Sequence, residues 1–530
     1  MMTLRRWRVF ATWILLLPGL TAPIRAGDEP ATKPLEAVVT YEQFGAVGDG
    51  LTDDLPAICA AHAHANEHDL PVRSKPDATY HLGRRALTAI IQTDTDWSMS
   101  RFIIDDSQGV ENHRLPLFEV RSRFAPVPLH LERLAAGQPR LEARPETDLL
   151  VLVENAHRRM FIRRGLNQNR GKEQSEVFIL RRDGTVEGDI EWDYDAVTRV
   201  EARPIDARPL FVRGGLFVNL ANRMRQPVGY NYWSRNILIT RSNTTIDGLT
   251  HQVGGETDVG HPYIGFLLAQ RAANITYRRC RVDGRKVYTT LGSANLPVPM
   301  GTYGYRADLV VNFRMEHCRT GDIHDASRWG VVATNFMKNV VLEDCMLSRM
   351  DVHEGVSGGY VIRRTTLGHA GLNAIGRGTL LVEDSTIRSG RFITFRDDYG
   401  STWDGDVVIR NSRWELPPAR GRYQAMFHVT NDGRHDFGYP CSMPRTIRIE
   451  GLYVDDSQLS PDHEGIVFFN DPLGESRGDR PHPYRLTEQV LVSDLKLASG
   501  RTPRVSPNPA LVDAIQVTVS PPVGATRAQH

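Results

Sequence analysis

The chain has 530 residues, of which 41% are hydrophobic and 24% are charged. This is the composition of a folded globular protein and argues against intrinsic disorder. Outside residues 1–26 the chain carries 60 basic and 63 acidic groups, a net charge of −3. A slightly acidic chain argues against a nucleic-acid partner, because such binding depends on neutralising phosphates.

Residues 1–26 have the pattern of a secretory signal peptide. Three arginines between residues 5 and 8 precede an apolar run at 9–20, which is too short to span a bilayer, and small residues lead to Ala26. We therefore expect a secreted or periplasmic protein, with an uncleaved N-terminal anchor as the alternative. No later segment is apolar enough to cross a membrane, so we expect no integral membrane association.

Residues 36–120 are expected to form an N-terminal cap and the first coils of the fold. Thr52, Asp53 and Asp54 place a hydroxyl and two carboxylates at a helix start, where unpaired N–H groups favour them. The helix, at about 55–68, has apolar residues on one side. We expect it to cover an open end of the fold, since uncovered strand edges invite association.

Residues 121–208 are expected to form a β-rich insertion. Strand-like pieces occur at 149–153 and 160–163, and Asp183-Gly184 is a good hairpin turn between two further strands. We expect this insertion to border a binding cleft.

An internal repeat runs through residues 209–500. Each unit places an apolar residue as an anchor, with a small or apolar residue three positions later, and the shortest unit is 20 residues long. The residues around each anchor alternate as in strands and show no helical period. Twenty extended residues trace about 65 Å, one lap of a narrow prism, which predicts a parallel β-helix. The anchors are Ile246, Tyr277, Met315, Leu342, Ile362, Val382, Ile409, Ile449 and Val492.

Stacking of successive laps in register predicts two ladders. The amide ladder would consist of Asn243, Asn274, Asn312 and Asn339. The thiol ladder would consist of Cys280, Cys318 and Cys345. We interpret the thiols as interior packing and not as a redox or metal site, because the chain has five cysteines and no Cys/His spacing of a metal site.

Polar residues at even positions after the anchors predict a charged wall. If the laps stack in register, the wall brings together Lys286, Tyr288, Asp322, His324, Arg349, Asp351, His353, His369, Asn373 and Arg391. A solvated face is the alternative, but such faces favour Lys and Glu, whereas this wall mixes His, Arg and Asp. We therefore expect a functional site on it.

The segment Phe44-Gly-Ala-Val-Gly-Asp-Gly-Leu-Thr-Asp-Asp54 resembles the entry motif of the pectate-lyase superfamily. The resemblance implies an all-β fold, the right-handed parallel β-helix, and a polygalacturonase-like or polysaccharide-lyase-like secreted protein. It says little about the reaction, because the motif's Asp residues cap a helix. In polygalacturonases a paired Asp motif precedes Gly-His-Gly, whereas here Gly368-His-Ala-Gly371 precedes Asp397-Asp398.

A long prism with a polar wall suits an acidic polysaccharide, and three functions remain open. The first is β-elimination, with arginines neutralising a uronate carboxylate and His353 or His369 as base. The second is glycoside hydrolysis by paired Asp residues such as Asp397, Asp398 and Asp404. The third is a non-catalytic glycan-binding surface. The sequence specifies no cofactor and leaves Ca²⁺ open, with Asp351 as a residue that would help to hold it.

The candidate residues follow from these functions. The candidate catalytic residues are His353, His369, Arg349, Asp351, Arg391, Arg396, Asp398 and Asp404. The candidate substrate-binding residues are Arg328, Trp329, Asn373, Tyr399 and Trp403. Residues 501–530 are rich in proline and are expected to form a C-terminal tail with little core. Nothing in the sequence specifies an oligomeric state.

Overall fold

The computed structural model describes residues 38–165, 169–223, 230–256, 260–284, 286–292, 295–328, 332–418, 421–473 and 480–520. The expected signal peptide and Trp329 lie outside the described residues. Within the described residues, no helix is both long and apolar enough to cross a membrane.

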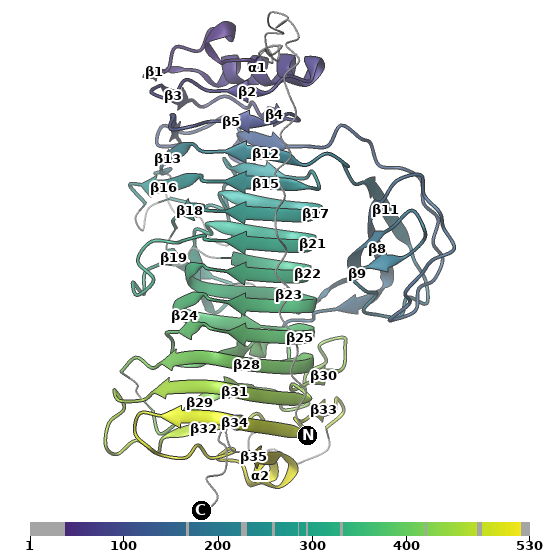
Figure 1. The fold of residues 1–530 in the computed structure, drawn as a ribbon, viewed down its shortest axis with the longest axis vertical. Coiled ribbons are helices and arrows are strands. Elements are labelled where there is room, and N and C mark those ends of the chain that lie inside the picture. Colours follow the sequence, from purple (N-terminus) through teal and green to yellow (C-terminus); the bar gives the residue numbers. More distant parts are fainter. Residues whose placement is uncertain are drawn as a thin grey trace, which may run out of the picture. The chain divides into compact units, whose positions relative to one another are not determined.

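The chain folds as a right-handed parallel β-helix, as the sequence predicted. Short strands wind in coils, and each strand pairs in parallel with the equivalent strand of the next coil, forming a stack (Figure 1). One sheet contains β1 (Asp49–Asp53), β3 (Thr79–Leu82), β6 (Arg101–Asp105), β13 (Leu216–Leu220), β16 (Thr250–Gly254) and β18 (Arg281–Val282).

A second set of strands forms the other walls and runs around the corners of the coils. Its early strands are β2 (Val72–Arg73), β4 (Ala89–Ile91), β5 (Thr95–Asp96), β7 (Phe118–Val120), β12 (Leu210–Arg213), β14 (Ile237–Ile239), β15 (Thr244–Asp247), β17 (Leu267–Arg278), β21 (Tyr305–Glu316) and β22 (Val332–Glu343). Its later strands are β23 (Met346–Arg363), β24 (Thr366–Ala374), β25 (Gly376–Glu383), β26 (Thr386–Ile387), β27 (Ile393–Phe395), β28 (Trp403–Glu415), β29 (Gln424–His428), β31 (Thr446–Asp455), β32 (Ile466–Phe469), β34 (Gln489–Leu497) and β35 (Gln516–Val519). Two small pairs complete the strands, namely β19 (Lys286–Leu291) with β20 (Pro297–Gly301) and β30 (Cys441–Ser442) with β33 (Tyr484–Arg485).

The predicted anchors stack in register through nine successive coils, from Ile246 beside Tyr277 to Ile449 beside Val492. All nine are buried, and they form part of one continuous core inside the coils. The repeat is therefore confirmed, because one apolar position per coil must face this interior.

The amide ladder is also confirmed. The side-chain amide of Asn274 donates to Asn243 at 2.7 Å, that of Asn312 to Asn274 at 2.8 Å, and that of Asn339 to Asn312 at 3.0 Å. All four residues have a positive φ between 52° and 61°, a conformation that Asn tolerates better than most residues. The same residue type therefore both makes the corner and joins the coils.

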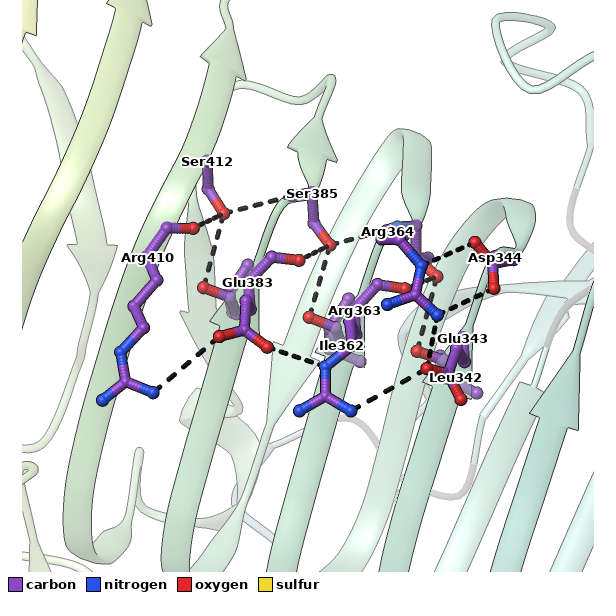
Figure 2. A network of polar contacts seen from close by, with 12 residues as sticks. Leu342, Glu343, Asp344, Ile362, Arg363, Arg364, Glu383, Ser385, Arg410 and Ser412 are labelled. Carbon is purple, nitrogen blue, oxygen red and sulfur yellow. Dashed lines mark hydrogen bonds and ion pairs between the residues drawn. The ribbon is translucent and has the colours of Figure 1, made fainter. Parts of the chain in front are cut away.

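The buried thiols continue as buried hydroxyls in later coils. The backbone N–H of Cys345 donates to the Thr365 hydroxyl, that of Thr365 to Ser385, and that of Ser385 to Ser412, at 3.1 to 3.2 Å. Figure 2 shows the outward charges beside this row, where Glu383 lies between Arg363 and Arg410. Burial raises the pKa of the Cys318 thiol far above its usual range, in keeping with a packing role.

The predicted helix is α1 (Leu55–His68), and its bounds are confirmed. Leu55, Ile58 and Ala61 on α1 are buried in the core of the coils, so the helix covers one end of the stack (Figure 1). The 3-10 turn η1 (Glu42–Phe44) precedes it.

The insertion is an antiparallel sheet in the order β10 (Val186–Glu187), β9 (Lys172–Leu180), β8 (Leu149–Met160) and β11 (Arg199–Pro204). One face packs Leu150, Leu152 and Ile179 against the coils, in contact with Ala273 and Val311. Alternate residues of β8 and β9 form a second small core on the other face. The insertion is therefore attached to the coils along an apolar seam.

The C-terminal region differs from the expected tail. Residues 509–514 form the helix α2 (Pro509–Ala514), and β35 then pairs in parallel with β34. Leu511 is fully buried and Ile515 nearly so. The proline-rich composition predicted a tail, but the segment forms one more coil. Pro509 is compatible with this structure because it stands at the start of the helix, a position that needs no N–H donor.

Candidate active site

A cleft of about 800 Å³ lies on the polar wall, between the coils and the insertion. The strand β23 supplies Glu354 and three alternate residues, Arg349, Asp351 and His353. Alternate residues of a strand point to one face, so this spacing places all three side chains on the cleft side. The cleft therefore forms where the sequence placed a functional wall.

The carboxylate of Asp351 is the centre of the cleft's polar network. It is almost fully buried and lies 2.9 Å from His353 Nε2, 2.8 Å from Arg396 Nη1 and 3.2 Å from Arg349 Nη2. The side-chain amide of Asn373 donates to it at 3.1 Å. Burial alone would raise the pKa of Asp351, but Arg349, His353 and Arg396 hold it well below its usual range.

His353 has one ring nitrogen held by this carboxylate. Its side chain is 23% exposed, and the bond through Nε2 leaves Nδ1 as the nitrogen available to a substrate. Burial lowers the pKa of His353 below its ordinary value, and Arg396 acts in the same direction, although Asp351 opposes them. The imidazole is therefore neutral near pH 7 and oriented by a carboxylate, as a general base requires.

A second carboxylate, Asp398, lies on the short 3-10 turn η2 (Asp397–Tyr399). It pairs with Arg396 at 2.8 Å and with Arg163 at 2.5 Å. Burial would raise its pKa, but Arg396 and Arg163 lower the pKa to about 2. Both guanidinium groups also lie over the Tyr399 ring, at 5.6 and 5.3 Å from its centre. The turn thus fixes two cations at the cleft.

The turn η2 depends on Gly400, which ends it with φ of 86°. A side chain at this position would collide with Phe437 and with the Cys441 sulfur. Glycine therefore permits both the turn and the close packing that hold Asp398 in place.

The other side of the cleft carries aromatic residues and one more ion pair. Tyr230, Tyr232 and Tyr303 line it, and the rings of Tyr232 and Tyr303 lie 5.8 Å apart. Lys172 of the insertion pairs with Glu354 at 2.6 Å. The cleft thus combines charged and aromatic residues in its lining, which suits a polar ligand with flat surfaces.

Eight of the 21 described residues that line the cleft were expected from the sequence, namely Arg349, Asp351, His353, Asn373, Arg396, Asp397, Asp398 and Tyr399. Arg163, Lys172 and Glu354 also line the cleft and were not expected from the sequence. Arg163 and Lys172 belong to the insertion, and Arg163 is 235 residues from Asp398 in the chain, so only folding brings them together.

The other residues of the predicted wall lie outside the cleft. Asp322 and His324 are exposed, and His324 bonds Arg388. Lys286 and Tyr288 belong to β19, which pairs with β20.

His369 and Arg391 are displaced because the register is not constant. Leu347 pairs with Leu367, but Arg349 pairs with Gly371, a slip of two residues between neighbouring strands. His369 therefore leaves the row of Arg349, and its Nδ1 lies 3.3 Å from the Ile323 carbonyl. Arg391 does not stack beside Asp351 and lies beside His428, lowering the pKa of that imidazole together with burial.

Three further candidates also lie outside the cleft. Trp403 is fully buried and donates its indole N–H to the Gly378 carbonyl at 3.3 Å, so it presents no face for a sugar. Asp404 is exposed and pairs with Arg485 at 3.3 Å. Arg328 pairs with Asp325 at 3.5 Å beside a different pocket.

No metal-binding cluster occurs in the part of the chain that the structure describes, where no three His, Cys, Asp or Glu side chains converge suitably. The carboxylates most suited to a cation, Asp351 and Asp398, are already paired with arginines. The residues present therefore do not fit the Ca²⁺ ion that the sequence left open.

No protein-family model matches the sequence. A capsule KL64-specific depolymerase of Klebsiella phage P510 is 32% identical over 94 residues, which cover 16% of this chain and 9% of that protein. The chain thus matches less than a tenth of the length of this curated relative.

Two solved structures are similar to this chain over most of its length. The tailspike gp61 of Pseudomonas phage phi297 is 12% identical, with 91% of this chain and 84% of that chain covered and a TM-score of 0.52. The tailspike gp49 of Pseudomonas phage LKA1 is 14% identical, with 86% and 81% covered and a TM-score of 0.49. The first of these supports the right-handed parallel β-helix fold that the entry motif implied.

Proposed function

We propose that this chain is an exported enzyme that cleaves an acidic polysaccharide by β-elimination. One observation carries the proposal: the imidazole of His353 lies 2.9 Å from the buried carboxylate of Asp351 inside an arginine-rich cleft. The local similarity to a capsule depolymerase supports a polysaccharide as substrate. Export would follow from the expected signal at residues 1–26.

The charge of the cleft supports an acidic polymer. Among the described lining residues, six are cationic and four are acidic, which leaves a net charge of +2. The cationic residues are Arg163, Arg164, Lys172, Arg306, Arg349 and Arg396. A uronate carboxylate entering the cleft would therefore be attracted, and guanidinium groups would stabilise the charge that develops on it.

Each residue has a definite part in the elimination. Nδ1 of His353 takes the C5 proton of the uronate, the bond between C4 and the glycosidic oxygen breaks, and a C4–C5 double bond forms. The imidazolium returns the proton to the leaving oxygen, which balances the reaction. Asp351 orients the ring and stabilises its charged form, while Arg349 and Arg396 hold Asp351 ionised.

Hydrolysis by paired carboxylates has less support. A hydrolase needs one carboxylic acid with a raised pKa to protonate the leaving oxygen. The two arginines lower the pKa of Asp398 to about 2, and Asp404 lies outside the cleft. Asp397 lines the cleft, where it pairs with Arg164 at 3.9 Å. A purely binding surface would not need an imidazole held by a carboxylate.

The proposal is tested by following ultraviolet absorbance of the purified protein with pectate, alginate, chondroitin, hyaluronan, heparan and acidic capsular polysaccharides. Elimination creates an unsaturated uronate, so absorbance rises. His353→Gln should lower kcat by about 100- to 10,000-fold, the usual contribution of a general base. His324→Gln is the matched control, because His324 is exposed and bonds Arg388 outside the cleft.

Two results would reject this mechanism. New reducing ends without absorbance would indicate hydrolysis. An unchanged kcat in His353→Gln would remove the proposed base.

A further inference from the structure

A second pocket, of about 350 Å³, lies where the insertion joins the coils, and we call it the joint pocket. The chain leaves the coils past Arg121 and Phe124 and returns past Arg203, and all three residues line the pocket. Arg271 of β17 and Glu119 of β7 complete the set used below. None of its lining residues lines the active-site cleft.

The joint pocket is positively charged. Its described lining has three arginines and one carboxylate, Glu119, a net charge of +2. Arg121 pairs with Glu119, while Arg203 and Arg271 share Glu201, which lies behind them. Three guanidinium groups thus converge on one hollow with two carboxylates between them, which favours a further anion.

One donor in the pocket is unsatisfied. The Nε–H of Arg271 is buried and has no hydrogen-bond partner among the described residues. The Arg271 side chain as a whole is 36% exposed and its Nη1 pairs with Glu201 at 3.5 Å, so an anion in the pocket can reach the exposed part of this guanidinium and add a charge-assisted hydrogen bond. Arg271 also has φ of 50°, an uncommon conformation for arginine, which is set by the corner of β17.

An exposed aromatic ring lies at the same pocket. Phe124 is 58% exposed, although a large apolar side chain is normally buried. A ring beside guanidinium groups can contact the apolar face of a sugar while the arginines hold its carboxylate. Phosphate or sulfate alone would make no use of the ring.

The joint pocket and the cleft lie along one corner of the coils. Arg271, Leu309, Phe336 and Glu354 occupy equivalent corner positions in four successive coils, and all have positive φ. Three strand spacings separate the first from the last, about 14 Å. Leu309 contacts the apolar seam of the insertion, and Phe336 contacts Phe161 of the insertion, so the insertion separates the two sites.

We propose that the joint pocket is a second, non-catalytic binding site for a uronate residue of an acidic glycan. The class of ligand rests on the proposed function, but binding at this pocket does not depend on catalysis at His353. A polymer held here would stay near the cleft between cleavage events.

The test uses the full chain carrying His353→Gln, so that ligands are not degraded. Short oligogalacturonate and oligomannuronate are the probes, with a neutral maltooligosaccharide as the control ligand. Calorimetry gives the number of sites, and hydrogen exchange reports protection at residues 118–126 and 199–206. We expect two sites for an acidic probe, protection of both segments, and neither effect with the neutral sugar.

Arg121→Gln with Arg271→Gln should weaken binding at the joint pocket about tenfold, because charge-assisted hydrogen bonds are lost. Binding at the cleft should not change. Arg448→Gln, at an exposed position on a distant coil, is the matched control. Thermal unfolding of each variant verifies that it is folded, and Phe124→Ala offers a second variant that leaves the charges in place.

The outcomes separate this inference from the proposed function. Binding of both acidic probes only at the cleft, or equal binding by the double variant and its control, would overturn the joint site. Protection at the joint pocket without cleavage of any uronate polymer would leave the joint site standing and reject the proposed lyase. An equal response to neutral and acidic sugars would contradict the role of the arginines.

Discussion

At the scale of single residues, the chemistry of this protein depends on how Asp351 is surrounded. Its two oxygens form hydrogen bonds with His353, Asn373 and Arg396, and Arg349 lies beside it as an ion-pair partner at 3.2 Å. A buried carboxylate is costly unless it is paired and hydrogen-bonded, and here its acceptor sites are well filled. The charge of Asp351 is thereby retained and is available to orient the imidazole.

The same surroundings predict the pH dependence of the reaction. A general base must be neutral, so activity falls as pH drops through the pKa of His353. Burial lowers this pKa from its ordinary value of 6.5, which places the acidic limb of the kcat/KM profile below pH 6.5. Asp351→Asn should move the limb to still lower pH, since Asp351 is the group that raises the pKa. Profiles of kcat/KM against pH measure both shifts, because they report the free enzyme.

The His324→Gln variant should keep the wild-type profile. An acidic limb centred above pH 6.5, or one that Asp351→Asn moves upward, would contradict the role given to this pair.

At the scale of elements, the amide ladder joins neighbouring coils at a corner. Asn312 lies in its middle, since it donates to Asn274 and Glu187 and accepts from Asn339. Its φ of 61° is accessible to Asn and Gly but costs other residues about 1–2 kcal/mol. The ladder therefore contributes to the free energy of unfolding in two separable ways, through its hydrogen bonds and through the backbone conformation that Asn tolerates.

Asn312→Ala should lose both contributions, about 2–4 kcal/mol of unfolding free energy. Asn312→Gly loses the hydrogen bonds but relieves the backbone, so we expect it to be about 1 kcal/mol more stable than the alanine variant. Urea unfolding followed by circular dichroism compares them. Equal midpoints for the two variants would show that the backbone conformation contributes nothing.

At the scale of the whole molecule, the insertion completes the cleft because it is fixed to the coils. Besides the apolar seam, Glu176 of β9 pairs with Lys338 of β22 at 2.6 Å, and both side chains are only 2% exposed. Lys338 also donates to the Asp189 carbonyl. Arg163 and Lys172 reach the cleft from the end of this fixed sheet.

Lys338→Met should weaken the docking of the insertion by about 3–5 kcal/mol, because Glu176 is left buried without its partner. Limited proteolysis should then cut residues 149–204 faster than the coils. Adding Glu176→Gln removes the unpaired charge and should restore part of the resistance. Lys496→Met, in an exposed pair with Asp494, should change little. Unchanged proteolysis of Lys338→Met would mean that the apolar seam alone holds the insertion.

The sequence by itself determined the parallel β-helix, the coil register of the anchors from Ile246 to Val492, and the amide ladder. These depend on local patterns repeated in every coil, and stacking requires equivalent residues to meet. Arg349, Asp351 and His353 were also predictable as neighbours, because alternation along one strand places them on one face. A prediction from spacing succeeds where the structure is periodic.

Only the tertiary structure decided which other residues complete the cleft. His369 and Arg391 leave the predicted wall because the register slips by two residues after Leu347. The slip lies at a corner between two anchors, so the spacing of the anchors does not reveal it. Burial of Trp403 also depends on how one coil lies over the next. Arg163 reaches Asp398 because an apolar seam fixes the insertion beside the coils, and such long-range packing has no local pattern in the sequence.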